Sequence, residues 1–160
     1  MTVIRNLEIS PSEFFGVVLE ELVKEIRSVD QADVRETDIC EGFQYTAHAE
    51  DPALKVFFEV VAYQEDKHYK SVCTSAAGAI TVTYDVVPTE KGISVTFSYE
   101  NTTPAGRKKK GLLGAFSEII FLSRMTDRLY DIQRTVINRK EGFTEWKSGS
   151  PLFPNIRKSL

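Results

Sequence analysis

The longest helical segment of this chain, Gly111–Lys140, follows a run of alternating segments and limits the folds that the chain can adopt. Roughly 28 residues of helix at about 1.5 Å per residue would span about 42 Å. The first half is strongly apolar, so we expect a sheet to pack against it. The second half, Asp127–Arg139, is charged and is expected to face water. The apolar positions recur at helical spacing: Leu112, Ala115, Phe116, Ile119, Ile120, Leu122, Met125, Leu129, Ile132 and Val136.

A second, shorter helix is predicted near the N-terminus. Ser10 is suited to cap it, Pro11 to begin it, and Glu13 to reach back to the cap. The helix should run from Pro11 to about Arg27, with Glu20, Glu21, Lys24 and Glu25 facing water. Its buried face is predicted to consist of Phe14, Phe15, Val18, Leu19, Leu22, Val23 and Ile26.

Between the helices, apolar and polar residues alternate in several short segments, which is typical of half-buried strands. The clearest pair is Ala79–Val87 with Ile93–Glu100, joined by the hairpin loop Pro88–Gly92. Further strands are predicted at Thr2–Ile9, Val34–Asp38, Phe43–Ala49, Leu54–Gln64 and His68–Ser75. A strand, a helix, a run of strands and a long helix together predict an α+β fold, with helices on one face of an antiparallel sheet.

The composition predicts one globular domain. The chain has 160 residues, of which 42% are hydrophobic and 27% charged, a balance typical of folded proteins. We assign residues 1–142 to the domain and 143–160, which lack periodicity, to an irregular tail. A signal peptide and a transmembrane segment are not expected, so a cytoplasmic location is predicted. Cys40 and Cys73 are isolated cysteines, which favours buried thiols over a disulfide or a metal site.

Three stretches carry a resemblance to a known superfamily. They are Ser10–Phe15, Glu41–Thr46, and the hairpin AITVTYDVVP with ISVTFSYE. With the order of elements, they resemble a small bacterial family of unknown function within the START/polyketide-cyclase-like (SRPBCC) helix-grip superfamily. The resemblance covers roughly residues 2–140. It implies a curved antiparallel sheet of about six to seven strands around the C-terminal helix, with a cavity between them. The superfamily includes lipid carriers, cyclases and chaperone activators, so the fold leaves the function open.

If the strand faces follow the alternation, the cavity lining is apolar, with only a few hydroxyl groups. Such a cavity would bind a small apolar or amphipathic molecule without catalysis, and no cofactor or metal is expected. Twelve residues are predicted to line it: Phe43, Tyr45, Phe58, Val60, Cys73, Val82, Tyr84, Phe97, Tyr99, Phe116, Ile120 and Leu129.

A basic loop precedes the long helix and consists of Arg107, Lys108, Lys109 and Lys110. It is either a solvated loop or a contact for an anion at the helix N-terminus. The two parts of the chain differ in charge: residues 1–66 carry 15 acidic and 5 basic side chains, and residues 67–160 carry 8 acidic and 15 basic ones. The sequence pI of about 5.5 argues against a nucleic-acid partner.

Two other kinds of function stay open. The chain can be an interaction or regulatory module with a filled core, and a homodimer would fit this alternative. It can also be an enzyme of the cyclase or hydrolase kind that uses Glu59, His48 or His68 as acid or base. Glu59 interrupts an apolar run, so it faces either the cavity or the opposite side of the sheet. The sequence contains none of the motifs typical of nucleotide, zinc or serine-hydrolase sites.

Overall fold

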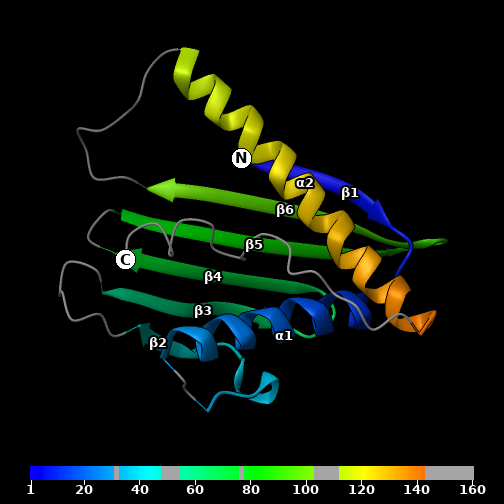
Figure 1. Ribbon diagram of the computed structural model, residues 1–160, viewed down its shortest axis with the longest axis horizontal. Helices are drawn as coiled ribbons and strands as arrows, with labels where there is room; N and C mark the ends of the chain where they lie inside the picture. The colour runs from blue at the N-terminus through cyan, green and yellow to red at the C-terminus, as the bar shows by residue number, and fades with distance from the viewer. Residues whose placement is uncertain (31–32, 48–54, 76–77, 103–111, 143–160) are drawn as a thin grey trace.

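The computed structural model describes residues 1–30, 33–47, 55–75, 78–102 and 112–142, and for residues 29–30, 47 and 112–122 it describes the backbone alone. Six strands form one antiparallel sheet, and both long helices lie on the same face of it (Figure 1). The elements are β1 (Thr2–Leu7), α1 (Pro11–Asp30), η1 (Glu36–Asp38), β2 (Gln44–Ala47), β3 (Val56–Gln64), β4 (His68–Ser75), β5 (Gly78–Thr89), β6 (Gly92–Thr102) and α2 (Leu112–Lys140). The predicted α+β helix-grip architecture is confirmed.

The strands lie in the order β1-β6-β5-β4-β3-β2, so the four central strands follow one another as a meander. β1 pairs with the far side of β6, which joins the N-terminal strand to the last one. The predicted hairpin is present: Thr89 pairs with Gly92 across a tight turn, and the register continues to Ala79 and Thr102. A register shift between Val60 and Ala62 in β3 marks a bulge, a feature that bends a strand and increases its twist.

Helix α1 begins as predicted. The Ser10 backbone N–H donates to Oε2 of Glu13 at 2.9 Å, and the Glu13 N–H donates to Oγ of Ser10 at 3.3 Å, which is the reciprocal capping box. The seven predicted apolar positions are all buried, as is Val17. The helix continues three residues beyond Arg27, to Asp30.

Helix α2 ends at Lys140, and Gly142 adopts φ +79° beyond it, as expected of a helix stop. The prediction that its charged half faces water is confirmed for Asp127, Arg134 and Arg139, which are exposed, and is wrong for one face of this half. Leu129 and Ile132 are at most 1% exposed, Val136 is 5% exposed, and Arg128 and Thr135 are buried with them. A narrow apolar stripe is sufficient here because this half packs against two other elements. The Glu8 N–H donates to Oε1 of Gln133 at the end of β1, and ion pairs connect α2 to α1.

The strand predicted at Val34–Asp38 is also wrong, because a 3₁₀ turn, η1, occupies this region. The Asp38 carboxylate accepts a hydrogen bond from the Arg35 N–H at 2.8 Å, and the Asp38 N–H donates to the Arg35 carbonyl at 3.0 Å. Aspartate often stabilises turns in this way, by offering the backbone a local partner in place of a strand. The sheet therefore has six strands, within the predicted range.

Candidate functional site

The candidate site is the sheet face that the helices cover. Directly paired residues of neighbouring strands share a face, so the strand register arranges this face in three rows. One row is Tyr45–Phe58–Cys73–Ile80, the next is Val60–Ser71–Val82–Tyr99, and the third is Tyr63–Tyr69–Tyr84–Phe97–Val3. Eight of the predicted lining residues fall in these rows, and Phe43, which precedes β2, stacks edge-on against Phe58 at 6.4 Å between ring centroids.

Burial changes along this face. In the third row Tyr69, Tyr84 and Phe97 are at most 4% exposed, whereas Tyr63 at its β3 end is partly buried. In the first two rows the middle residues are buried, but Ile80, Tyr45 and Tyr99 are only partly buried at the margin of the core. The structure therefore covers one end of the face more completely than the other.

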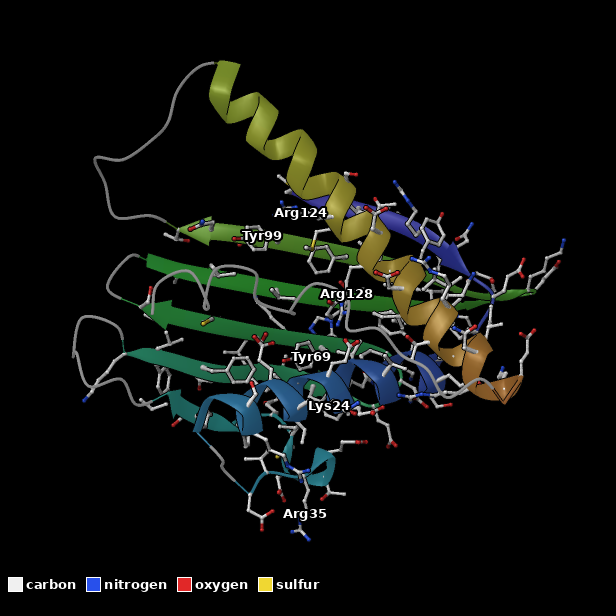
Figure 2. All side chains as sticks on the ribbon, viewed as in Figure 1. Lys24, Arg35, Tyr69, Tyr99, Arg124 and Arg128 are labelled. Atoms are coloured by element: carbon white, nitrogen blue, oxygen red, sulfur yellow. The ribbon has the colours of Figure 1, made fainter. Side chains whose placement is uncertain are left out.

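The position of the helices explains this difference. Their closest ends are joined by the ion pairs Glu13–Lys140 at 2.8 Å and Glu20–Arg139 at 2.7 Å. From there the helices diverge, with α1 running over β3 and β4 and α2 running across β5, β6 and β1 (Figure 1). Tyr99 lies on β6, on the side toward which the helices diverge (Figure 2).

At the covered end, aromatic rings fill the interior. Tyr84 contacts Phe14 at 5.6 Å, Phe97 at 5.0 Å and Tyr69 at 6.2 Å between ring centroids. Burial raises the pKa of both Tyr69 and Tyr84. Both phenols are therefore neutral groups, which suits a structural core and not acid–base chemistry near neutral pH.

A charged pair also lies inside, which the sequence interpretation missed. Glu21 of α1 and Arg128 of α2 form an ion pair between Oε2 and Nη2, and their side chains are only 8% and 7% exposed. Figure 2 shows Arg128 projecting from α2 over the sheet. Burial lowers the pKa of Arg128 to about 10, and the negative charge of Asp131 opposes that shift. The guanidinium stays positively charged at neutral pH.

The prediction that Glu21 faces water is therefore wrong, and a signal in the sequence points to the inward position. Glu21 follows Val18 by three residues, and Arg128 lies three residues after Met125 and four before Ile132. Both positions fall on the apolar stripe of their helix, since residues three and four apart share a face.

The thiol of Cys73 lies on the same face. It is buried as predicted, and burial, together with the negative charge of Glu25, raises its pKa to about 11. The Glu25 side chain is half-buried, so the prediction that it faces water is only partly right. Cys40, by contrast, is exposed, so the prediction of two buried thiols holds for Cys73 alone.

Two of the three candidate acid–base residues lie on the opposite face of the sheet. Glu59 pairs with Gln44, whose Nε2 donates to its carboxylate at 3.1 Å. His68 pairs with Asp85, with Nδ1 and Oδ1 separated by 2.6 Å. His48, the third candidate, lies outside the described residues. In the part of the chain that the structure describes, no three histidine, cysteine or carboxylate side chains gather as metal ligands would.

Of the predicted lining residues on α2, Leu129 is 1% exposed and belongs to the core. The side chains of Phe116 and Ile120, the basic loop Arg107–Lys110 and the tail 143–160 lie outside the description. None of the helices, within the residues described, is long and apolar enough to cross a membrane.

Fold and site together define a helix-grip protein, in which a curved sheet packs against a long C-terminal helix. Comparison with family models makes the assignment specific. Residues 1–121 match the model of DUF3284, described as a domain of unknown function, and the chain belongs to this family. No curated protein sequence matches the chain significantly.

Several solved structures share the fold at low sequence identity. Protein MLL2253 from Mesorhizobium loti is 14% identical, with a TM-score of 0.55 over 91% of this chain and 98% of its own. Ara h 8.0201 is 10% identical, with a TM-score of 0.55 over 86% and 97%. The polyketide-cyclase-like protein Cgl2372 from Corynebacterium glutamicum is 16% identical, with a TM-score of 0.50 over 92% and 96%. These similarities show a shared fold and do not extend to activity.

Proposed function

We propose that this protein binds a small hydrophobic or amphipathic molecule between the concave sheet face and helix α2, without catalysing a reaction. The observation that carries the proposal is the change in burial along that face. Its rows are apolar and aromatic, the helices close over one end, and the residues at the other end are only partly buried. Apolar surface that its own chain leaves partly covered is what a hydrophobic ligand would cover.

The residues at the less covered end indicate what a ligand would meet there. Ile80 offers aliphatic surface, and Tyr99 offers a ring with a hydroxyl. Burial raises the pKa of Tyr99, while a hydrogen bond with Asn101 opposes the rise. The phenol is therefore a neutral polar group at one edge of an apolar surface, so shape and a few hydrogen bonds would determine specificity.

The positions of the candidate acid–base groups support a non-catalytic function. A general acid or base must come within hydrogen-bonding distance of its substrate. Glu59 and His68 bond to Gln44 and Asp85 on the outer face, with the sheet between them and the proposed ligand.

Ligand binding is tested by native mass spectrometry of the purified protein and by thermal shift with a library of aliphatic and aromatic compounds. We expect retained ligand, or library members that raise the melting temperature, because binding to the folded state alone stabilises it. If no mass is retained and no compound shifts the melting temperature, the proposed function is wrong.

A matched pair of variants on β5 then locates the ligand. Ile80→Trp places a large ring at the less covered end of the concave face, whereas Val87→Trp places the same ring on the outer face, where Val87 is 61% exposed. We expect Ile80→Trp to weaken binding by about tenfold or more, which corresponds to a loss of about 1.4 kcal/mol. Val87→Trp should leave it unchanged. Equal effects of the two variants would place the ligand elsewhere.

The alternative is an interaction module with a filled interior, which the close aromatic packing around Tyr84 favours at the covered end. A homodimer would fit this alternative, and light scattering of the purified protein tests it. The anion contact at Arg107–Lys110, the cytoplasmic location, and the division into a domain at 1–142 and a tail at 143–160 stay predictions.

A further inference from the structure

The buried pair Glu21–Arg128 is incompletely satisfied. A guanidinium group has five N–H donors, and a carboxylate has two acceptor oxygens. Nη2 and Oε2 form the ion-pair contact. Among the described residues, Nε of Arg128 and both carboxylate oxygens of Glu21 have no hydrogen-bond partner, although all three atoms are inaccessible to solvent. Buried polar atoms are nearly always hydrogen-bonded, so an unused donor on Arg128 and the unused acceptors of Glu21 require an explanation.

The need to hold α1 and α2 together is a weak explanation for this buried pair. The same two helices are already connected by Glu13–Lys140 and Glu20–Arg139 nearer the protein surface. A buried ion pair costs desolvation of both charges, and a well-packed apolar pair is often as stable or more stable. The pair also lies on the apolar stripes of both helices, which face the sheet on which the ligand is proposed to bind.

We propose that Glu21 and Arg128 together hold the polar end of the bound molecule, and that this end is a neutral group able to both donate and accept a hydrogen bond, such as a hydroxyl. This inference rests on the proposed function and specifies the class of ligand. A hydroxyl would donate to Oε1 of Glu21 and accept from Nε of Arg128, while its alkyl part would lie along the apolar rows.

The charges of the pair explain why the group would be neutral. Glu21 and Arg128 compensate each other, so a ligand carboxylate or ammonium would bring an unbalanced charge into a buried site. A methyl ether of the same size would accept a hydrogen bond but would leave Oε1 of Glu21 without a donor. Leaving a buried charged acceptor unpaired is costly.

The test compares head groups on one alkyl chain. Octan-1-ol, its methyl ether, octanoate and octylammonium compete with a neutral fluorescent apolar probe, N-phenyl-1-naphthylamine, for the full-length protein. Octan-1-ol is expected to displace the probe at a concentration about tenfold lower than the other three, as a hydrogen bond to a charged group would give.

Two double variants assign this preference to the pair. Glu21→Leu/Arg128→Leu removes the buried pair and should abolish the preference while probe binding persists. The matched control, Glu20→Leu/Arg139→Leu, removes an ion pair between the same helices whose side chains are 26% and 50% exposed, and it should keep the preference. Circular dichroism checks that both variants fold.

If the Leu double variant does not fold, Glu21→Gln tests the inference instead, because it should shift the preference from octan-1-ol toward octanoate. It leaves the Arg128 charge uncompensated, so octanoate should gain at least about tenfold relative to octan-1-ol. Equal displacement by all head groups, or a preference that survives loss of the pair, would overturn the inference and leave the proposed function standing. Failure of the probe and of every competitor to bind would overturn both.

Discussion

Replacing Ile132 by alanine tests whether the charged half of α2 belongs to the core. Ile132 is fully buried, and the substitution removes three side-chain carbons. At about 0.8 kcal/mol for each buried carbon the transfer cost is about 2.4 kcal/mol, and the cavity left behind brings the expected loss to about 2–5 kcal/mol. If this half of the helix faced water, as its charges suggest, the loss would be below about 0.5 kcal/mol.

Urea unfolding followed by circular dichroism measures the difference. For a slope of about 2 kcal/mol per molar urea, the midpoint should fall by about 1–2.5 M. The control is Ile4→Ala, which removes the same atoms from a side chain that is 58% exposed. It should cost less than about 1 kcal/mol, including the weaker strand preference of alanine. A loss for Ile132→Ala below about 1 kcal/mol, or no larger than that for Ile4→Ala, would refute the assignment.

Three further predictions follow from backbone, thiol and carboxylate geometry. Gly92 has φ +148°, and a Cβ there would overlap the Leu7 carbonyl oxygen and lie 2.9 Å from Cα of Glu8, so Gly92→Ala should lower the melting temperature. Gly16 lies in helix α1, and no atom lies within 4 Å of a methyl group added there, so Gly16→Ala should raise the melting temperature. A melting temperature that rises for Gly92→Ala and falls for Gly16→Ala would contradict the geometry. Because burial raises the pKa of Cys73 to about 11, iodoacetamide near neutral pH should modify exposed Cys40 first and Cys73 only on unfolding. Mass spectrometry measures the order of modification, and equal rates for the two thiols would contradict the burial of Cys73. The pKa of Glu13 is lowered from 4.5, chiefly by Lys140 and the Ser10 N–H. Its contribution to stability is therefore present above that pH and lost as the pH falls through the folded-state value. Glu13→Gln should destabilise the protein at neutral pH and have little effect in acid, and a pH-independent difference would disagree.

Local chemistry made much of the fold predictable. The capping box at Ser10 and Glu13 depends on residues within one turn and was identified from sequence. The alternation in β5 and β6 predicted which side chains share a face, and the register confirms it from Val82–Tyr99 to Val86–Val95. Such patterns are visible because helix and strand periods are fixed by backbone geometry.

Other predictions failed where polar groups found partners that local patterns do not show. Val34–Asp38 has residues that suit a strand, but Asp38 offers the Arg35 backbone a nearer partner. Glu21 and Arg128 were assigned to water because a single charged side chain is costly to bury. The cost falls when an opposite charge meets it, and here that charge lies on another helix, more than a hundred residues away in the chain.

By itself, the sequence determined the two helices, most of the strands, the alternation of their faces and the apolar lining of the concave side. Each of these depends on neighbours within a few residues, whose spacing sets the face on which a side chain lies. Only the tertiary structure decided how far the helices cover that face, that one face of the charged half of α2 is buried, and that Glu21 meets Arg128 inside. Those outcomes depend on the angle and depth at which α1 and α2 pack across the sheet, and many weak contacts between distant residues set them together.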